Sequence, residues 1–328
     1  MKRTGNLFEQ IADFNNLRTA YLKAVKGKRL SNTALIFDLK TDENLCRIKK
    51  ELESGTYRIG KYRQFKIYDP KERTITAASF EDRIVHHAIM NVLEPVFERQ
   101  FIFHTYACRK QKGTHKAVQY AFKKAGSCKC FLKLDVRKYF DSIPHKRLKE
   151  LLCRIIKDRK CLALLFEIID SYRVSDGRGL PIGNLTSQFF ANYYLSPLDH
   201  FVLEKLKPKG YARYMDDIAV FSDSKSALKN ILDEMQKFTA PFSLFFKQPV
   251  INSCRNGVPF LGYSVSDKRI SLLNRTRRRK ARKARLLVYE FNHGLIDEEK
   301  FADRINCMEI AVTNIERNVR IPLNFARF

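Results

Sequence analysis

The sequence predicts an α+β protein whose central element is a split βαβ sheet. Three observations lead to this prediction. Between residues 130 and 250, apolar and alternating runs follow the order strand, helix, strand, strand, helix, strand. Segments with helical spacing of apolar residues precede this region, and a strongly basic helical segment follows it. The length of 328 residues suits two or three packed units.

The N-terminal part is predicted to be mainly helical, with one hairpin. Helical spacing of apolar residues occurs over residues 7–26, 33–54, 80–99 and 114–125. Gly55 and Gly126 are the predicted stops of the second and fourth of these helices. Alternation predicts strands over 57–68 and 73–78, joined by a turn at Asp69-Pro70. Lys66, Lys71 and Arg73 lie at the tip of this hairpin, so the tip is basic.

The predicted sheet region contains a strand over 130–136 and a pair of strands around residues 213–221. Helices are predicted over residues 145–156 and 226–238. The loop 179–188 is predicted to open a third helix, with Asn184 or Thr186 as its cap. A last strand of the sheet is predicted over 243–250, with a further short strand or turn over 257–263. The loop 179–188 is Gly-rich, which lets backbone approach a ligand closely, but it lacks the Gly-Lys-Ser/Thr of a P-loop.

Two adjacent carboxylates, Asp216 and Asp217, occupy the predicted turn between two apolar and aromatic strands. An ionised carboxylate in such surroundings is costly unless a cation or hydrogen bonds compensate it. The pair is therefore either a metal site or an ordinary polar turn. Asp135 ends the strand 130–136, where a lone aspartate is usually a cap or turn residue. A split βαβ sheet brings these strand ends together, which favours the metal site.

The net charge of +27, from 62 basic and 35 acidic residues, predicts a polyanionic partner. Nucleic acid is favoured over a membrane surface, because no lipid-anchor signal, long apolar run or signal peptide is present. A basic helix is predicted over 267–285. Its charged side either binds phosphates or is simply a solvated face. Its basic residues are Lys268, Arg269, Arg275, Arg277, Arg278, Arg279, Lys280, Arg282, Lys283 and Arg285. A second helix is predicted over 297–316, capped by Asp297.

The eight cysteines lack the spacing of a zinc site. Cys128 and Cys130 are the only close pair, and no second Cys or His pair follows them. Reduced, mostly buried thiols in a cytosolic protein are therefore expected.

Together these segments resemble a reverse transcriptase over residues 55–290. The resemblance is carried by Tyr214-Met215-Asp216-Asp217, by Phe131-Leu132-Lys133-Leu134-Asp135 with Phe140 five residues on, by the hairpin region 60–100 and by the turn 258–263. It implies a right-hand polymerase with fingers, a split βαβ palm and a helical thumb. The implied boundaries are 1–128 for the N-terminal region and fingers, 129–265 for the palm with an interleaved fingers segment at 145–190, and 266–328 for the basic thumb.

The loop Ile182-Gly183-Asn184-Leu185-Thr186-Ser187-Gln188 narrows the resemblance, because most group II-type enzymes have Gln-Gly followed by Ser-Pro there. This loop pattern resembles that of the reverse transcriptases of diversity-generating retroelements. The compact length, in which no endonuclease or additional maturase domain is evident, is also similar to theirs. That family implies copying of a template-repeat RNA into cDNA with errors opposite adenine, for replacement of a variable gene segment. It also implies a pentameric accessory protein (Avd), dNTPs, a primer duplex, and a cytoplasmic, bacterial or phage-encoded enzyme.

The alternatives are a group II intron- or retron-like reverse transcriptase, or a non-catalytic RNA-binding or defence protein on a polymerase fold. The intact set of three aspartates argues against the last. By the resemblance, Asp135 and Asp216 bridge two Mg²⁺ ions, Asp217 supports them, and Val136 belongs to the ligand set. Carboxylate oxygens are ligands that Mg²⁺ prefers.

The resemblance also implies the nucleotide contacts. Arg73, with Lys71 or Lys66, would hold the triphosphate. The alternative is that these residues form a solvated hairpin tip with no ligand. Phe140 would exclude a 2′-hydroxyl, unless it is a core residue. Ile182 offers only shape to the nascent base pair, and Gln188 contacts the nucleotide or packs in its helix. Lys247 is a candidate to protonate pyrophosphate. The residues expected to grip the template–primer duplex are Arg275, Arg277, Arg278, Arg279, Lys280, Arg282 and Lys283.

Overall fold

The computed structural model describes residues 3–27, 31–68 and 72–306, and the chain forms two compact units. Unit 1 comprises Met1–Ile102, Arg137–Asp199 and Phe238–Phe245. Unit 2 comprises Phe103–Val136, His200–Lys237 and Phe246–Phe328. Each unit therefore combines three separate stretches of the chain, and each is described by itself below.

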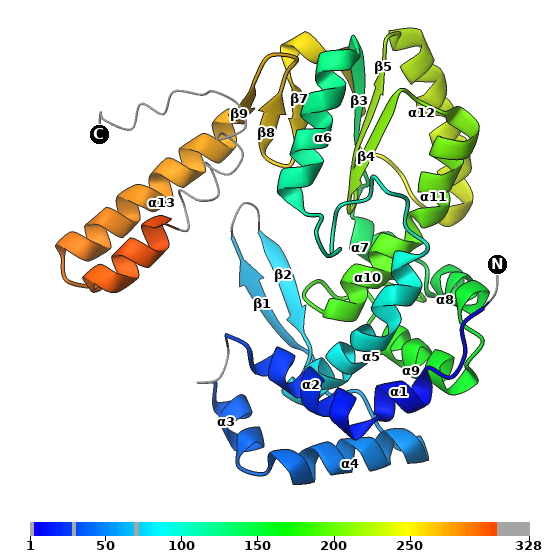
Figure 1. Ribbon diagram of the computed structural model, residues 1–328, viewed down its shortest axis with the longest axis vertical. Helices are drawn as coiled ribbons and strands as arrows, with labels where there is room; N and C mark the ends of the chain where they lie inside the picture. The colour runs from blue at the N-terminus through cyan, green and yellow to red at the C-terminus, as the bar shows by residue number, and fades with distance from the viewer. Residues whose placement is uncertain (1–2, 28–30, 69–71, 307–328) are drawn as a thin grey trace. The chain divides into compact units, whose positions relative to one another are not determined.

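Unit 1 is mainly helical (Figure 1). Its helices are α1 (Phe8–Ala12), α2 (Phe14–Val25), α3 (Asn32–Asp38), α4 (Thr41–Ser54), α5 (Phe80–Glu98), α7 (Tyr139–Ser142), α8 (His145–Ile155), α9 (Arg159–Asp170) and α10 (Leu185–Tyr194). The helix predicted over 7–26 is two helices, because the side chain of Asp13 caps α2 by accepting from the amide of Asn16 at 3.1 Å. The helix predicted over 33–54 is likewise divided into α3 and α4. Gly55 ends α4 as predicted, in the left-handed region with φ 72°.

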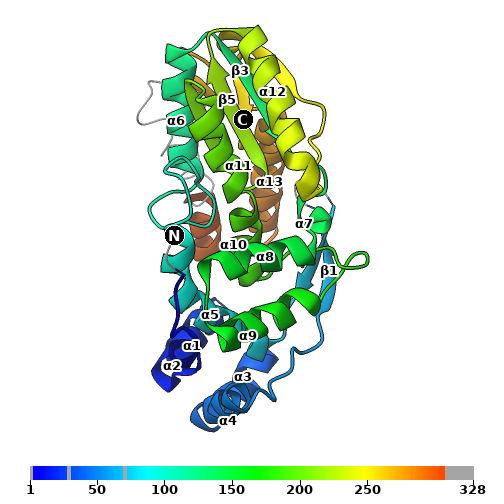
Figure 2. The ribbon, with the colours of Figure 1, turned by 90° about the vertical axis from the view of Figure 1, so that its right-hand side faces the viewer.

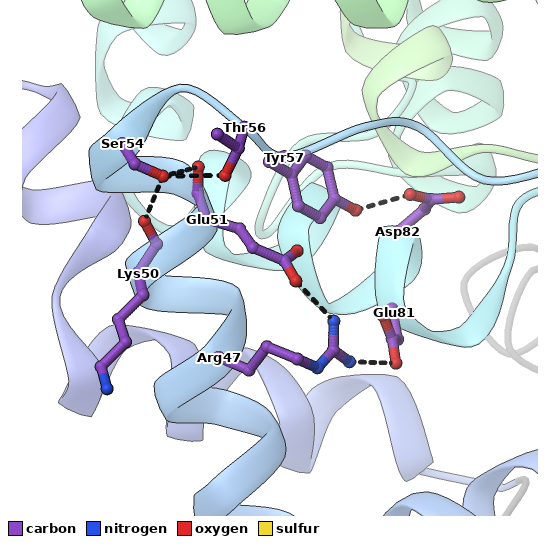
Figure 3. Close-up of polar contacts among 8 residues, drawn as sticks. All are labelled: Arg47, Lys50, Glu51, Ser54, Thr56, Tyr57, Glu81 and Asp82. Atoms are coloured by element: carbon purple, nitrogen blue, oxygen red, sulfur yellow. Dashed lines mark hydrogen bonds and ion pairs between the residues drawn. The ribbon is translucent and has the colours of Figure 1, made fainter.

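A buried carboxylate fixes the chain between α4 and α5 (Figure 3). Asp82, in the first turn of α5, accepts from the hydroxyl of Tyr57 at 2.5 Å and from the amide of Gly60 at 3.1 Å. On the surface, Arg47 of α4 contacts both Glu51 and Glu81. The segment that leads into the hairpin is thus held to the start of α5.

The predicted hairpin is present as β1 (Arg63–Ile67) and β2 (Arg73–Ala77), with Ile67 opposite Arg73. Its strands are shorter than predicted at both outer ends. Arg73 begins β2 and is exposed, and Lys66 forms an exposed ion pair with Glu72 at 2.7 Å. Lys71 lies outside the described residues.

Unit 2 contains the predicted split βαβ sheet. Its strands are β3 (Cys130–Asp135), β4 (Gly210–Tyr214), β5 (Asp217–Ser222) and β6 (Val250–Ser253). The order is β4-β5-β3-β6 and all pairs are antiparallel. Helices α6 (Thr114–Ser127) and α12 (Lys225–Thr239) lie on opposite sides of the sheet (Figure 2). α11 (Ser196–Phe201), which begins in unit 1, and a π-helical turn (Val202–Leu206) precede β4.

The core of unit 2 lies between α6, one face of this sheet and a second sheet. The second sheet consists of β7 (Val258–Phe260), β8 (Tyr263–Val265) and β9 (Ile270–Leu272). Phe131, Phe221 and Phe260 are at most 1% exposed and belong to one cluster with the alanines of α6. Because side chains alternate along a strand, the face that carries Phe131 also carries Lys133 and Asp135.

Three predicted element boundaries are wrong. The last strand of the sheet is Val250–Ser253, not 243–250, because the chain leaves a 3₁₀ turn (Ala240–Phe242) with Ser243 at φ 57°. Gly126 does not stop α6, which continues to Ser127. The basic helix α13 (Asn274–Asn292) begins later than residue 267, because β9 pairs with β8 across a turn closed by Ser266 and Arg269.

After α13, residues 298–306 are helical, and the amide of Lys300 donates to Asp297 at 2.8 Å, as the predicted cap requires. The rest of the helix predicted over 297–316 lies outside the described residues. Within the described ranges, no helix is long and apolar enough to span a bilayer. The cysteines in these ranges are free thiols.

Candidate active site

The aspartate pair lies on a tight hairpin turn. Tyr214 of β4 pairs with Asp217 of β5, so Met215 and Asp216 form a two-residue turn. Met215 has φ 57°, the left-handed conformation that such turns require and that a methionine rarely adopts. The fully buried Arg213 supports the turn, because its Nη1 donates to the carbonyl of Met215 at 3.0 Å.

Asp135 reaches this turn through the register of the sheet. It lies directly opposite Asp217, because β3 pairs antiparallel with β5. The amide of Val136 donates to the carbonyl of Asp216 at 3.4 Å, which ties the end of β3 to the turn itself. Three carboxylates that lie 81 and 82 residues apart in the chain (216 − 135 and 217 − 135) thus meet at one end of the sheet.

Two lysines contact these carboxylates. Lys133 of β3 forms an ion pair with Asp217, and Lys247 Nζ lies 2.5 Å from Asp135 Oδ1. The amide of Lys247 also donates to the carbonyl of Asp135 at 2.8 Å. Sequence reasoning singled out Lys247 but missed Lys133. The available signal was alternation, which places Lys133 two residues before Asp135 on the same face.

Burial shapes the electrostatics of the carboxylates. Burial, and then the nearby charge of Asp135, raise the pKa of Asp216 above its usual value. Burial raises the pKa of Asp217 to about 6, although the neighbouring Lys133 ammonium opposes that rise. A raised carboxyl pKa means that the folded protein favours the protonated acid. This contribution to stability is therefore present at low pH and is lost as pH rises through about 6.

The donor set fits a hard divalent cation. The side chains of Asp135, Asp216 and Asp217 offer only oxygen, and Val136, whose side chain is apolar, offers only its main-chain carbonyl. As the side chains stand, no group of three or more His, Cys, Asp and Glu within the described ranges is arranged to hold a metal ion. The ammonium groups of Lys133 and Lys247 contact two of the three carboxylates instead.

In unit 1, the Gly-rich loop is joined to strand β2. The amide of Thr76 donates to the carbonyl of Ile182 at 2.8 Å, and the amide of Ala78 donates to Asn184 Oδ1 at 3.1 Å. Gly183 has φ 126°, and a Cβ there would lie 2.8 Å from a methyl carbon of Ile75. Asn184 precedes α10 as predicted, but its side chain makes no cap bond, because Ala78 uses its oxygen.

The other predicted nucleotide contacts also belong to unit 1. Phe140, in the short helix α7, is half-buried and is joined to the same loop, because its carbonyl accepts from the amide of Leu180 at 2.9 Å. Gln188 is half-buried inside α10. Phe140 and Ile182 are thus fixed in one unit with Arg73, while the carboxylates belong to the other unit.

The basic face predicted for the thumb is present on α13. The helix carries no acidic residue before Glu290. Arg277, Arg278 and Arg282 are exposed, as are Arg275 and Lys283, whereas Arg279 and Lys280 are half-buried. Like charges at this density repel one another, and a polyanion relieves that repulsion.

The fold of unit 2, a split βαβ sheet with helices on both of its sides, is that of the palm of right-hand polymerases. The model of the family "reverse transcriptase (RNA-dependent DNA polymerase)" matches residues 66–265, which is more than half of the chain. The chain belongs to this family.

Several curated proteins are similar to parts of the chain. The group II intron-encoded protein LtrA of Lactococcus lactis subsp. cremoris is 27% identical over 197 residues, covering 56% of this chain and 33% of LtrA. The putative COX1/OXI3 intron 2 protein of Saccharomyces cerevisiae is 22% identical, covering 79% of this chain and 38% of that protein. Protein YkfC of Escherichia coli is 26% identical, and the match covers 48% of this chain and 45% of YkfC. The chain thus spans less than half the length of these relatives.

Among solved structures, apo telomerase from Candida tropicalis is similar at 12% identity. Its TM-score is 0.48, and the match covers 66% of this chain and 49% of that one. A likeness at this level carries no argument about function.

Proposed function

We propose that the protein is an RNA-directed DNA polymerase. The observation that carries this proposal is the meeting of Asp135 with Asp216 and Asp217 at one end of a split βαβ sheet, in a chain of the reverse transcriptase family. The basic face of α13 supports it, because a template–primer duplex is a polyanion. DNA synthesis from an RNA template, a primer and dNTPs is the assay that tests it.

In the proposed reaction, a primer 3′-hydroxyl attacks the α-phosphorus of a dNTP. The hydroxyl loses its proton to solvent, a new P–O bond forms, the bond from the α-phosphorus to the bridging oxygen breaks, and pyrophosphate leaves with the electron pair. Two divalent ions, proposed as Mg²⁺, would activate the hydroxyl and stabilise the leaving group when bound. Asp135, Asp216 and the carbonyl of Val136 would hold them, and the pairing of β3 with β5 keeps these oxygens at one end of the sheet. Lys247 is the proposed proton donor to pyrophosphate.

Arg73 is proposed to bind the triphosphate, because guanidinium donates two parallel hydrogen bonds to phosphate. It is exposed at the start of β2, the strand that also holds the loop of Ile182. Lys71 and Lys66 are the proposed neighbours in this role, although Lys66 is paired with Glu72. Gln188 is proposed as a further contact.

Phe140→Ala is expected to admit ribonucleotides. The Phe140 ring is proposed to stack under the sugar and to leave no room for a 2′-hydroxyl. Its removal should raise incorporation of rNTPs relative to dNTPs by about 10- to 100-fold, the range that one steric contact provides. Competitive incorporation on one RNA template measures the ratio. Phe140→Tyr, which keeps the ring, is the control, and unchanged sugar selection in Phe140→Ala would exclude the role.

At a finer level, we propose an enzyme of the diversity-generating retroelement type, cytoplasmic and encoded by a bacterium or phage. The proposal rests on Ile182 and the Ser187-Gln188 ending of the loop. Its partners would be a template-repeat RNA, its cDNA and a pentameric accessory protein (Avd). The similarity to intron-encoded proteins favours a group II-like reverse transcriptase as the alternative. A near-duplicate repeat beside the gene, differing mainly at adenines, would distinguish the two.

Ile182→Gln is expected to lower misincorporation opposite template adenine by about tenfold. An apolar side chain discriminates only by shape, whereas a hydrogen-bonding side chain penalises an incorrect pair more strongly. Sequencing of cDNA made in vitro measures the error rate. Ile182→Leu, which keeps the apolar character, should leave it unchanged. Equal adenine errors in the Gln and Leu variants would remove Ile182 from the explanation of infidelity.

A further inference from the structure

Of the two ammonium groups at the carboxylate cluster, that of Lys133 is held more firmly. Its side chain is 12% exposed, and its Nζ donates to Asp217 Oδ1 and to the carbonyl of Leu134 at 3.1 Å. The register explains how it fits, because Lys133 lies opposite the small Ala219 on β5. On another side, Nζ lies 5.7 Å from the ring centroid of the fully buried Phe260. Packing and two oxygen acceptors therefore fix this ammonium group.

The second lysine–aspartate pair of the cluster differs in burial. Lys247 and Asp135 are 49% and 41% exposed, against 12% and 24% for Lys133 and Asp217. An exposed ion pair contributes little and exchanges readily, whereas separating a buried pair leaves an uncompensated charge. A cation that enters the cluster will thus displace Lys247 from Asp135 far more easily than Lys133 from Asp217.

We propose that Lys133 is a built-in counter-cation that keeps Asp217 in an ion pair, so that Asp217 does not bind the divalent ion. In this arrangement Asp135 and Asp216 supply the carboxylates for a divalent ion, and Lys133 limits the net negative charge of the cluster and so its affinity for that ion. Lys133 is a positioning residue, because it acts through Asp217 and not on the nucleotide. The inference rests on the proposed function only in taking a divalent cation as the ligand.

Binding of Mn²⁺ to the full chain tests the inference, with no primer, template or nucleotide present. Free Mn²⁺ is measured by electron paramagnetic resonance at pH 8.5, above the pKa of about 6 of Asp217. Lys133→Met removes one nearby positive charge and is expected to tighten Mn²⁺ binding at least about tenfold. Lys133→Arg keeps the charge and should bind as the wild type does. Lys209→Met, at the exposed pair with Asp223 elsewhere in unit 2, should change the affinity by less than about threefold.

A double variant distinguishes the loss of the Lys133–Asp217 ion pair from a general loss of stability. Lys133→Met alone should lower the melting temperature of the metal-free protein, because Asp217 loses its partner. Adding Asp217→Asn should restore the melting temperature and return Mn²⁺ affinity towards the wild-type value. Unchanged or weaker Mn²⁺ binding in Lys133→Met, or a double variant as unstable as the single one, would overturn the inference. A wild type that binds Mn²⁺ but fails to synthesise DNA would instead refute the proposed function.

Discussion

Asp216→Asn combined with Asp217→Asn is expected to abolish DNA synthesis, by a factor of at least about 10⁴, while RNA binding persists. The two changes remove two of the three carboxylates that meet at the end of β3 and β5. Asparagine has nearly the same shape, so the hairpin turn should remain. A cluster with one carboxylate left lacks the charge to hold metal ions that stabilise the transferring phosphate.

The measurement is single-turnover primer extension on an RNA template, with binding of the same template–primer followed in parallel. Asp223→Asn is a matched control, because Asp223 is a carboxylate of the same unit whose partners are Lys209 and the amide of Lys129. It should retain near wild-type synthesis. Synthesis by the Asp216/Asp217 variant within tenfold of the wild type would show that these carboxylates are not the metal site.

Replacing four exposed cations of α13 by glutamine is the second large change. The variant carries Arg277→Gln, Arg278→Gln, Arg282→Gln and Lys283→Gln. Each lost phosphate contact should reduce the slope of log affinity against log salt by about 0.7–0.9. Affinity for an RNA–DNA duplex is therefore expected to fall about 10²- to 10³-fold at about 0.1 M salt. Filter binding over a range of salt concentrations measures both quantities.

The control removes the same total charge from another surface of unit 2. It replaces the exposed lysines Lys205, Lys225, Lys229 and Lys237, on and before α12, by glutamine. Its affinity should remain within about threefold of the wild type, since long-range effects of exposed charges are screened. If both variants lose affinity equally, net charge and not the face of α13 governs duplex binding.

The carboxylate hairpin was predictable because its signal is local. An apolar and aromatic run interrupted by Met-Asp-Asp specifies two short strands and a tight turn, and Tyr214 and Asp217 do pair across it. The link to Asp135 required only the order of elements, since the split βαβ order β4-β5-β3-β6 places β3 beside β5.

The remaining features depend on contacts distant in sequence. The pairing of Lys133 with Asp217 follows from the register between β3 and β5, which periodicity does not give. The strand predicted over 243–250 failed for a similar reason. Those residues alternate suitably, but before the ladder with β3 begins at Val250 they meet the end of β3 only in an isolated bridge, Phe246 to Val136. The side chain of Asn184 serves the distant Ala78 and not its own helix, which capping rules cannot anticipate.

Primer extension by the wild-type protein tests the central claim most directly. The reaction contains an RNA template, a DNA primer, four dNTPs and Mg²⁺, with Mn²⁺ in a parallel series and a chelator as the blank. We predict template-dependent DNA synthesis that requires the divalent ion and stops when the template is omitted. Tight binding of the template–primer without any extension, in either metal and over pH 7–9, would contradict the account and leave a nucleic-acid-binding protein on a polymerase fold.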